Sequence, residues 1–168
     1  HNTLLINYQL KQGTNSDAER NKSIKVKFDF RIYFAITSLQ PLRVWIHRKG
    51  FARLTTKEFS LEGDAAKDLQ RHVANIHFQT QFPEYTFTKS RHDDCSGSCR
   101  STHCVMKEMS AMTGKPVEAI WESIDDIIGK TGAALKPALQ NEKQPCDGCY
   151  QIWGADIVFD IYANPYLL

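Results

Sequence analysis

The stretch from Lys25 to Ser38 reads KVKFDFRIYFAITS and decides how this chain of 168 residues folds. Apolar side chains alternate strictly with a second set along it, and a period of two residues indicates a β-strand with two unlike faces. β-branched and aromatic residues dominate, as is typical of strands. We expect one face to be continuous apolar surface directed toward a core. Its residues are Val26, Phe28, Phe30, Ile32, Phe34 and Ile36.

The opposite face of this strand carries Lys27, Asp29 and Arg31 in one row. Neighbours on one face of a strand lie about 7 Å apart, so the two cations flank the carboxylate closely. Such a row is either the solvated outer face of an antiparallel sheet or a polar floor that binds a charged ligand.

Further strands are expected on both sides of this stretch. A short apolar run at residues 4–8 predicts a strand, and the polar residues 11–23 predict a solvent loop. Two strand-like runs, 42–47 and 51–56, follow. They are joined by Arg48-Lys49-Gly50, which we interpret as a hairpin turn in which glycine supplies a positive φ.

Two helices are predicted in the second half of the chain. Residues 115–128 place six apolar side chains on one helical face and acidic side chains on the other, with Gly129 suited to the helix end. The acidic face is interpreted as solvated. Residues 64–75 also fit a helix, with Leu69 and Val73 on one face.

A second alternating strand is predicted at residues 151–162, QIWGADIVFDIY. Asp156 falls on its less apolar face, and a carboxylate inside an otherwise apolar strand is costly unless it is paired or bound to a metal. Asn164-Pro165 predicts a turn, and residues 166–168 begin a return strand.

Composition limits the class of protein. A length of 168 residues favours one domain, and 42% apolar residues suffice for a sizeable core. A net charge of +2 gives no argument for nucleic acid, and no apolar run of about 18 residues predicts a membrane span. Because the chain begins at His1 and stops inside an expected strand, we interpret it as a piece of a longer protein.

Five cysteines fall in two groups. The spacings C-x₃-C at Cys95 and Cys99 and C-x₂-C at Cys146 and Cys149 resemble zinc-site halves, so a structural Zn²⁺ is one hypothesis. The alternative is a set of reduced surface thiols that includes Cys104. An odd count argues against a full disulfide framework, and an intracellular setting argues against any disulfide.

Residues 25–56 resemble the tubulin–tyrosine ligase-like family. Its ordered signature is a KFDxR strand, a TS..PLR turn and strand, and then a glycine and an arginine. These pieces correspond to residues 27–31, 37–43 and 50–53, while 115–168 resemble the family's last helix and strands more loosely. The resemblance implies an α+β, ATP-grasp-like fold, an antiparallel sheet flanked by helices. We expect residues 1–168 to form one partial domain with a cysteine-containing insertion around 91–110.

The resemblance also implies a reaction, the ATP-dependent ligation of tyrosine, glutamate or glycine to a protein through an acyl phosphate. The protein substrate would be tubulin or another partner, with a free amino acid as co-substrate and neither nucleic acid nor membrane involved. The protein would be cytoplasmic and associated with the cytoskeleton. The fragment alone is expected to be inactive, because it lacks the family's upstream nucleotide-binding strands and the Glu and Asn expected beyond Leu168.

Six residues carry the implied site. Lys27 and Asp29 match a nucleotide-contacting pair, and Arg31 and Arg53 match arginines that hold the amino acid or the acyl phosphate, where a planar fork suits carboxylate and phosphate. Asp156 matches a Mg²⁺ ligand. The remaining residue, Asn75, matches a family asparagine near the nucleotide phosphates only through the partial agreement of His72 and Asn75.

Two other classes of function stay open at this point. A ligase-like domain that binds tubulin or another partner without catalysis is suggested by Ala74, which lacks a family hydroxyl, and by the cysteine insertion. A zinc-stabilised interaction module is the third hypothesis.

Overall fold

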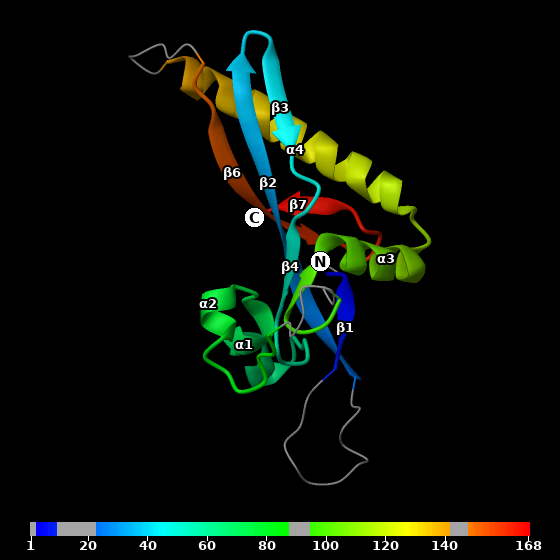
Figure 1. Cartoon of the computed structure of the whole chain (residues 1–168). Coiled ribbons are helices and arrows are strands. Elements are labelled where there is room, and N and C mark those ends of the chain that lie inside the picture. The colour runs from blue at the N-terminus through cyan, green and yellow to red at the C-terminus, as the bar shows by residue number, and fades with distance from the viewer. Residues whose placement is uncertain (1–2, 10–22, 88–94, 142–147) are drawn as a thin grey trace, which may run out of the picture.

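The structure is a computed structural model that describes residues 3–9, 23–87, 95–141 and 148–168 (Figure 1). Within these ranges the strands form one antiparallel sheet of seven strands, flanked by helices. Its central strand is β2 (Ser23–Leu39), which has 17 residues and includes the whole alternating stretch from Lys25 to Ser38. The expected α+β class with an antiparallel sheet is confirmed.

Both edges of β2 are occupied along most of its length. β1 (Leu5–Gln9) and then β6 (Gln151–Phe159) pair along one edge. β4 (Phe51–Leu54) and then β3 (Leu42–Ile46) pair along the other. β5 (Cys99–Ser101) extends the sheet beyond β4, and β7 (Pro165–Leu167) extends it beyond β6. A strand paired on both edges cannot shift its register by one residue without exposing its apolar face, so the alternation of β2 is fixed.

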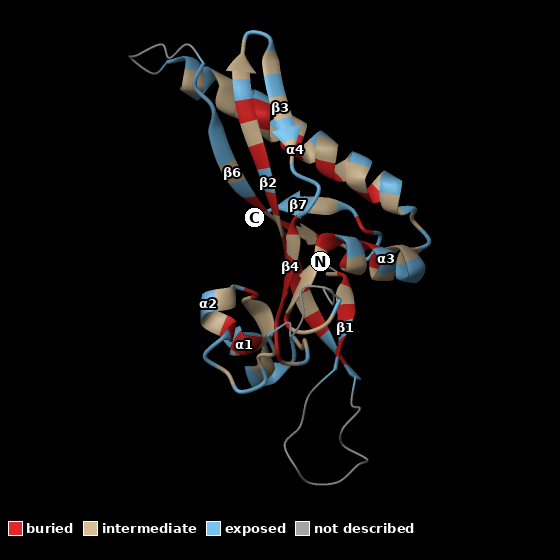
Figure 2. Cartoon of the chain, in the orientation of Figure 1, coloured by how far each residue is buried: buried red, intermediate tan, exposed pale blue. Residues whose placement is uncertain are grey.

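The apolar face of β2 forms the core, as the sequence predicts. All six expected residues are buried, and Figure 2 shows the buried positions as red bands along the strand. α3 (Thr102–Thr113) and α4 (Val117–Gln140) contribute further buried side chains to this core. At its centre the rings of Phe28 and Phe30 lie 5.7 Å apart, and that of Phe159 lies 4.9 Å from Phe30.

The expected hairpin at residues 48–50 is wrong. β3 and β4 do not pair with each other; each pairs with a different part of β2. Gly50 is buried and does not have a positive φ. A Cβ atom on it would lie 2.5 Å from the carbonyl oxygen of Arg31 and 2.8 Å from Cδ1 of Ile32. Glycine is therefore needed here for close backbone approach rather than for a turn.

The helix that begins at Val117 continues to Gln140, so the prediction that it ends at Gly129 is also wrong. Buried residues recur every four positions at Ile120, Ile124, Ile128 and Gly132. A Cβ on Gly132 would lie 2.7 Å from Cγ2 of Val44 on β3. Packing against the sheet thus outweighs the weak helix propensity of glycine. None of the helices in the described ranges is long and apolar enough to cross a membrane.

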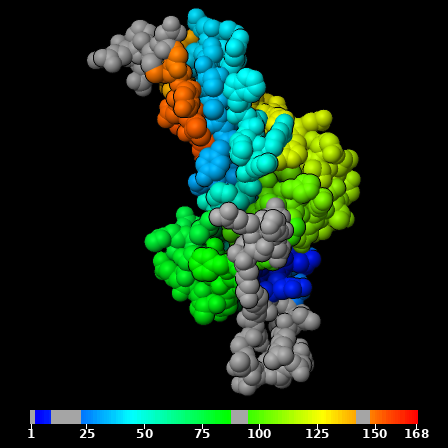
Figure 3. All heavy atoms as spheres, viewed as in Figure 1, coloured from blue at the N-terminus to red at the C-terminus, as the bar shows by residue number. Residues whose placement is uncertain are grey.

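Residues 57–87 form a lobe of short helices in place of the single helix expected at 64–75. The helices are η1 (Gly63–Lys67), α1 (Leu69–His72) and α2 (Ile76–Gln79). Leu69 is 58% exposed, and the buried residues of the lobe are Gln70, Ala74 and Gln79. Both amides bond to the hydroxyl of Thr56, so a polar network organises this lobe rather than an apolar helix face. In the space-filling view the outline of the molecule is hollowed between this lobe and the part of the chain formed by β6 and the end of β2 (Figure 3).

Gly50→Ala should destabilise the protein by about 2 kcal/mol or more, because overpacking at a site closed by backbone cannot relax cheaply. Gly129→Ala is the matched control, since nothing lies within 4 Å of its added Cβ. It should stabilise the fold by about 0.5–1 kcal/mol through helix propensity. Chemical denaturation of both variants measures the difference, and equal effects would contradict the proposed close approach.

Candidate functional site

The polar row of β2 meets charged side chains from both neighbouring strands. Asp29 lies opposite Arg53 of β4, and Arg31 lies opposite Asp156 of β6. Residues opposite each other in an antiparallel ladder project to the same face of the sheet. Three strands that are distant in the sequence therefore bring four of the six predicted site residues together.

The four side chains form a continuous ion-pair network, called here the Arg–Asp network: Asp29, Arg53, Asp156 and Arg31. The fork of Arg53 binds Asp29 with Nε 2.6 Å from Oδ1 and Nη2 2.8 Å from Oδ2. The fork of Arg31 binds Asp156 with Nε 2.5 Å from Oδ1 and Nη2 2.9 Å from Oδ2. Arg53 Nη2 also lies 3.0 Å from Asp156 Oδ1, which joins the two pairs.

Burial divides this network into an inner and an outer half. The side chains of Arg53 and Asp29 are 7% and 8% exposed, whereas those of Arg31 and Asp156 are 28% and 30% exposed. Burial raises the pKa of Asp29, and the hydrogen bonds from Arg53 oppose that rise. Burial also disfavours the charged form of Asp156, but hydrogen bonds from Arg31 and Arg53 outweigh it and lower its pKa. The accessible half therefore presents an ionised carboxylate beside a guanidinium.

Lys27 and Asn75 lie outside the network. Lys27 is half-buried on the same face of β2, and no carboxylate of the described residues lies within 4.0 Å of its ammonium. Asn75 caps α2, where its side-chain oxygen accepts a hydrogen bond from the backbone of Phe78 at 3.3 Å. It contributes no hydrogen bond to the four charged side chains, and its place at the start of a helix explains why an asparagine suits it.

Gly154 is a site residue that the sequence reasoning missed. Gly154 is on β6, opposite Tyr33 of β2. It precedes Asp156 by two residues and lies on the same face of the sheet. A Cβ on it would lie 3.1 Å from Cδ of Arg31 and 3.5 Å from Nε. The bare backbone at Gly154 therefore leaves room for the stem of Arg31 to lie across β6 and reach Asp156. A glycine inside an alternating strand was the available signal, because it marks close approach of another group.

An aromatic pair stands beside Arg31 on the same face. Tyr33 follows Arg31 on that face of β2, and Phe51 is the β4 residue opposite Arg31. Their rings lie 6.4 Å apart. Arg31 is thus bordered by apolar surface, which strengthens its interaction with any anion that excludes water there.

The cysteines do not have the arrangement expected of reduced thiols. Cys95 and Cys104 form a disulfide, contrary to the expectation of none, and Cys149 is also disulfide-bonded. Cys99 lies on β5 opposite Arg53, and Cys146 lies outside the described residues. The structural Zn²⁺ hypothesis for Cys95, Cys99, Cys146 and Cys149 stays a prediction. Among the described residues, no group of three or more His, Cys, Asp or Glu side chains is placed to hold a metal ion.

The fold and the network define a class of protein, an α+β domain whose antiparallel sheet carries paired arginines and carboxylates on one face. A family model described as the Tubulin-tyrosine ligase family matches residues 20–168, and the chain belongs to this family. The resemblance seen in residues 25–56 is therefore confirmed over nearly the whole chain.

Similar curated proteins carry related names. The chain is 31% identical over 150 residues to tubulin polyglutamylase TTLL6 of Mus musculus, covering 84% of this chain and 18% of that protein. The Homo sapiens protein of the same name is 32% identical over 152 residues, covering 84% and 16%. A probable beta-tubulin polyglutamylase of Tetrahymena thermophila is 26% identical over 151 residues, covering 85% and 13%. The chain thus spans less than a fifth of the length of each of these three relatives.

Loss of the inner arginine should cost more stability than loss of the outer one. Arg53→Ala leaves Asp29 buried without its partner, and such a loss costs about 3–5 kcal/mol. Arg31→Ala leaves the more exposed Asp156 still paired with Arg53, and we expect a loss of about 1 kcal/mol. Urea denaturation of the two variants compares them directly. Equal losses would show that the two halves of the network do not differ in burial as described.

Gly154→Val should push the stem of Arg31 away from β6 and weaken its bond to Asp156. Because that bond helps to lower the pKa of Asp156, the pKa should rise toward its ordinary value, with little change in overall stability at this exposed position. Ile152→Ala, on the same face of β6 but opposite Ala35 and four residues from Asp156, is the control. Titration of the Asp156 carboxyl by NMR gives the answer, and an unchanged pKa would refute this role of Gly154.

Proposed function

We propose that this chain is the magnesium-binding and substrate-binding part of an ATP-dependent ligase that joins an amino acid to tubulin. Family membership supports ligation, and the relatives named as tubulin polyglutamylases favour glutamate over tyrosine or glycine. The observation that carries the proposal is the Arg–Asp network, with its accessible half open on one face of the sheet. Cytoplasmic, cytoskeleton-associated localisation and tubulin as the partner belong to the same proposal.

The reaction class accounts for the residue types. A carboxylate that accepts a phosphoryl group from ATP becomes an acyl phosphate, and an attacking amine then displaces phosphate. Every species along this route carries negative charge that cations must offset. Lys27, whose ammonium has no carboxylate partner among the described residues, supplies charge toward the phosphates. Arg31 offers a planar fork to the amino acid carboxylate or to the acyl phosphate.

The inner pair has a different role in this proposal. The guanidinium of Arg53 is almost fully buried and is engaged by both Asp29 and Asp156. We therefore assign Arg53 and Asp29 to positioning: they hold Asp156 in place on one side while Arg31 holds it on the other. A direct contact of Arg53 with substrate would require its fork to leave Asp29, which would leave a buried carboxylate unpaired.

Asp156 has the chemistry of a magnesium ligand. Its lowered pKa keeps it ionised, and a carboxylate oxygen is the hard ligand that Mg²⁺ prefers. A bound Mg²⁺ would neutralise phosphate charge at this position. In this part of the chain Asp156 is the one ligand that we assign to the ion, so the remaining ligands would come from ATP, water or other parts of the protein. The proposed inactivity of the isolated fragment follows from the same reasoning.

The non-catalytic alternative is not favoured. Ala74 and the cysteine insertion suggest it, whereas the similar proteins named as tubulin polyglutamylases support a ligase. The four network residues are brought together on one face of the sheet, and its outer half is accessible to a ligand.

Arg31→Ala in the full-length protein should reduce the incorporation of glutamate into tubulin at least 100-fold, with only a small loss of stability. Arg31→Lys, which keeps the charge but lacks the fork, should recover little of that activity. Lys130→Ala is the control, because Lys130 is a solvent-exposed cation paired with Asp126 on α4. Radiolabelled amino acid incorporation and thermal denaturation supply the two measurements. Wild-type incorporation in Arg31→Ala would rule out the proposed role.

A further inference from the structure

The face of the sheet that carries the Arg–Asp network continues, exposed, toward the far end of β2. Trp45 of β3 and Ile152 of β6 both lie opposite Ala35 of β2, one on each side of it. Residues that lie opposite each other project to the same face. Trp45 is 64% exposed and Ile152 is 62% exposed, although both side chains are large and apolar. We call this area the uncovered face, and its residues are Tyr33, Trp45, His47 and Ile152.

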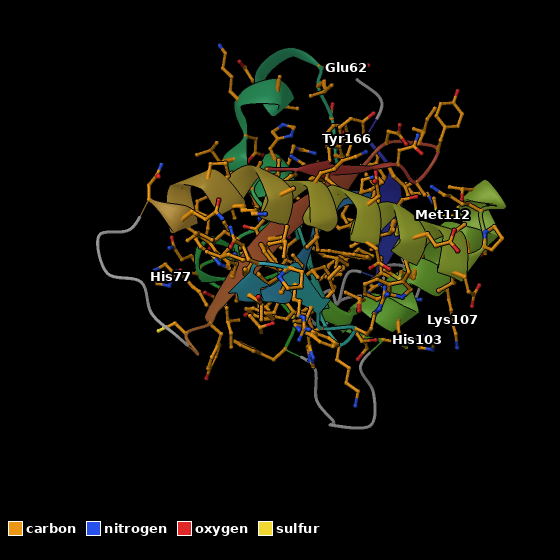
Figure 4. The ribbon with its side chains drawn as sticks, turned by 90° about the horizontal axis from the view of Figure 1, so that it is seen from above. Glu62, His77, His103, Lys107, Met112 and Tyr166 are labelled. Carbon is orange, nitrogen blue, oxygen red and sulfur yellow. A yellow bond between two sulfur atoms is a disulfide. The ribbon has the colours of Figure 1, made fainter. Side chains whose placement is uncertain are left out.

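Helix α4 packs on the opposite face of these strands. Val44 precedes Trp45 and projects to the other side of β3, where a Cβ on Gly132 of α4 would lie 2.7 Å from its Cγ2. Figure 4, seen from above, shows α4 along one side of the strands. In Figure 3 the spheres of β6, β2 and β3 lie side by side toward the viewer, in orange, blue and cyan. The exposed apolar side chains are therefore on the side of the sheet away from α4.

Tyr33 connects the uncovered face with the Arg–Asp network. It lies between Arg31 and Ala35 on the same face of β2 and is 37% exposed. The amide of His47 donates to the carbonyl of Tyr33 at 2.8 Å, which continues the pairing of β3 with β2 toward the network. Because positions on one face of a strand repeat about every 7 Å, the row that contains Trp45 lies about 14 Å from Arg31.

The charge along these strands is of one sign. Residues 30–56 include no Asp or Glu, and their five Lys and Arg residues are Arg31, Arg43, Arg48, Lys49 and Arg53. Arg31 and Arg53 belong to the network, and Nη2 of Arg48 lies 2.6 Å from Oδ2 of Asp125. Among the described residues, no carboxylate lies within 4.0 Å of the guanidinium of Arg43. Arg43, Trp45 and His47 are exposed at alternate positions, so a cation, an aromatic ring and an imidazole follow one another on this side of β3.

We propose that the uncovered face binds an extended, acidic segment of the protein substrate next to the Arg–Asp network. An extended polypeptide repeats its side chains on one side about every 7 Å, which is also the spacing from Arg43 to Trp45 and from Trp45 to His47. Carboxylates of the segment pair with Arg43 and approach His47, while an apolar side chain between them packs on Trp45. The inference rests on the proposed function, because that function makes the partner a polypeptide rather than a nucleic acid.

The distance to the network determines which residues of the substrate this face contacts. The row of Trp45 lies about 14 Å from Arg31, and an extended chain advances about 3.3 Å per residue. With the modified residue at Arg31, Trp45 therefore contacts a residue about four positions away from it. A substrate that ends closer to the modified residue does not reach Trp45.

The first test is equilibrium binding of the full-length protein to a fluorescein-labelled peptide of 12 residues that alternates Glu with Val, measured by fluorescence anisotropy without ATP. Trp45→Ala and Arg43→Ala should each raise the Kd at least fivefold. Leu61→Ala is the control for loss of an exposed apolar side chain, because Leu61 is also 64% exposed but lies in the lobe at residues 57–87. Lys130→Ala is the control for loss of a cation. Both controls should bind the peptide as wild type does.

Three results would overturn the inference. The first is an equal Kd for wild type and Trp45→Ala, and the second is an equal Kd for a peptide in which Lys replaces every Glu. The third uses an oligothymidylate of 12 nucleotides. If Trp45→Ala weakens binding of this polyanion as much as binding of the peptide, the face is a general polyanion site and its assignment to a polypeptide is wrong. Thermal denaturation checks that each variant is folded, and Arg43→Ala decides if Trp45→Ala is not.

Failure of this inference and failure of the proposed function give different results. Peptide binding requires neither ATP nor turnover, so a loss of binding in Trp45→Ala supports the docking surface even if the protein does not ligate. If both hold, Trp45→Ala should raise at least fivefold the KM for an acceptor peptide that extends six residues on each side of the modified residue. The KM for the free amino acid, and that for an acceptor with one flanking residue, should not change.

Discussion

Burial of the Asp29 carboxylate is the constraint on which the polar side of this domain depends. Asp29 lies in the middle of a strand that is paired on both edges, and an unpaired charge there would cost several kcal/mol. A guanidinium that donates two hydrogen bonds from the same face of the sheet satisfies this carboxylate. Arg53 does so because it lies directly opposite Asp29 in the pairing of β4 with β2. Arg53 also contacts Asp156 of β6, so the position of β6 relative to β4 is tied to the same guanidinium. One buried charge thus fixes the relative placement of three strands.

The sequence predicts each strand of this arrangement but not how the strands meet. Strict alternation identifies both faces of β2, and the isolated carboxylate of Asp156 signals the need for a partner. The partner itself depends on register. A glycine between two short strands fits a hairpin turn and a close backbone approach equally well. Gly50 is needed for close backbone approach, because a Cβ there would lie 2.5 Å from the carbonyl oxygen of Arg31. With β3 and β4 paired as a hairpin, Arg53 would not have been opposite Asp29, so the network could not be derived from the sequence alone.

Where packing or polar contacts override local propensity, the sequence prediction fails. α4 continues past Gly129 because Ile128 and Gly132 extend its buried stripe, and about 1 kcal/mol of glycine cost is small beside that packing. The lobe at residues 57–87 has no apolar period to detect, since Gln70, Gln79 and Thr56 organise it through hydrogen bonds. The spacing of five cysteines likewise does not specify which of them pair.

The outer half of the network has a consequence for how ligands bind under the proposed function. Arg31 and Asp156 satisfy each other through two hydrogen bonds in a partly buried setting. An anion that binds Arg31 alone would draw its fork away from Asp156, and a cation at Asp156 alone would do the same to Arg31. In the first case Asp156 keeps only its contact with Arg53, and in the second Arg31 loses its carboxylate partner. When an anionic substrate and a cation bind together, each side chain exchanges one partner for another, so the network favours joint binding over binding of either alone.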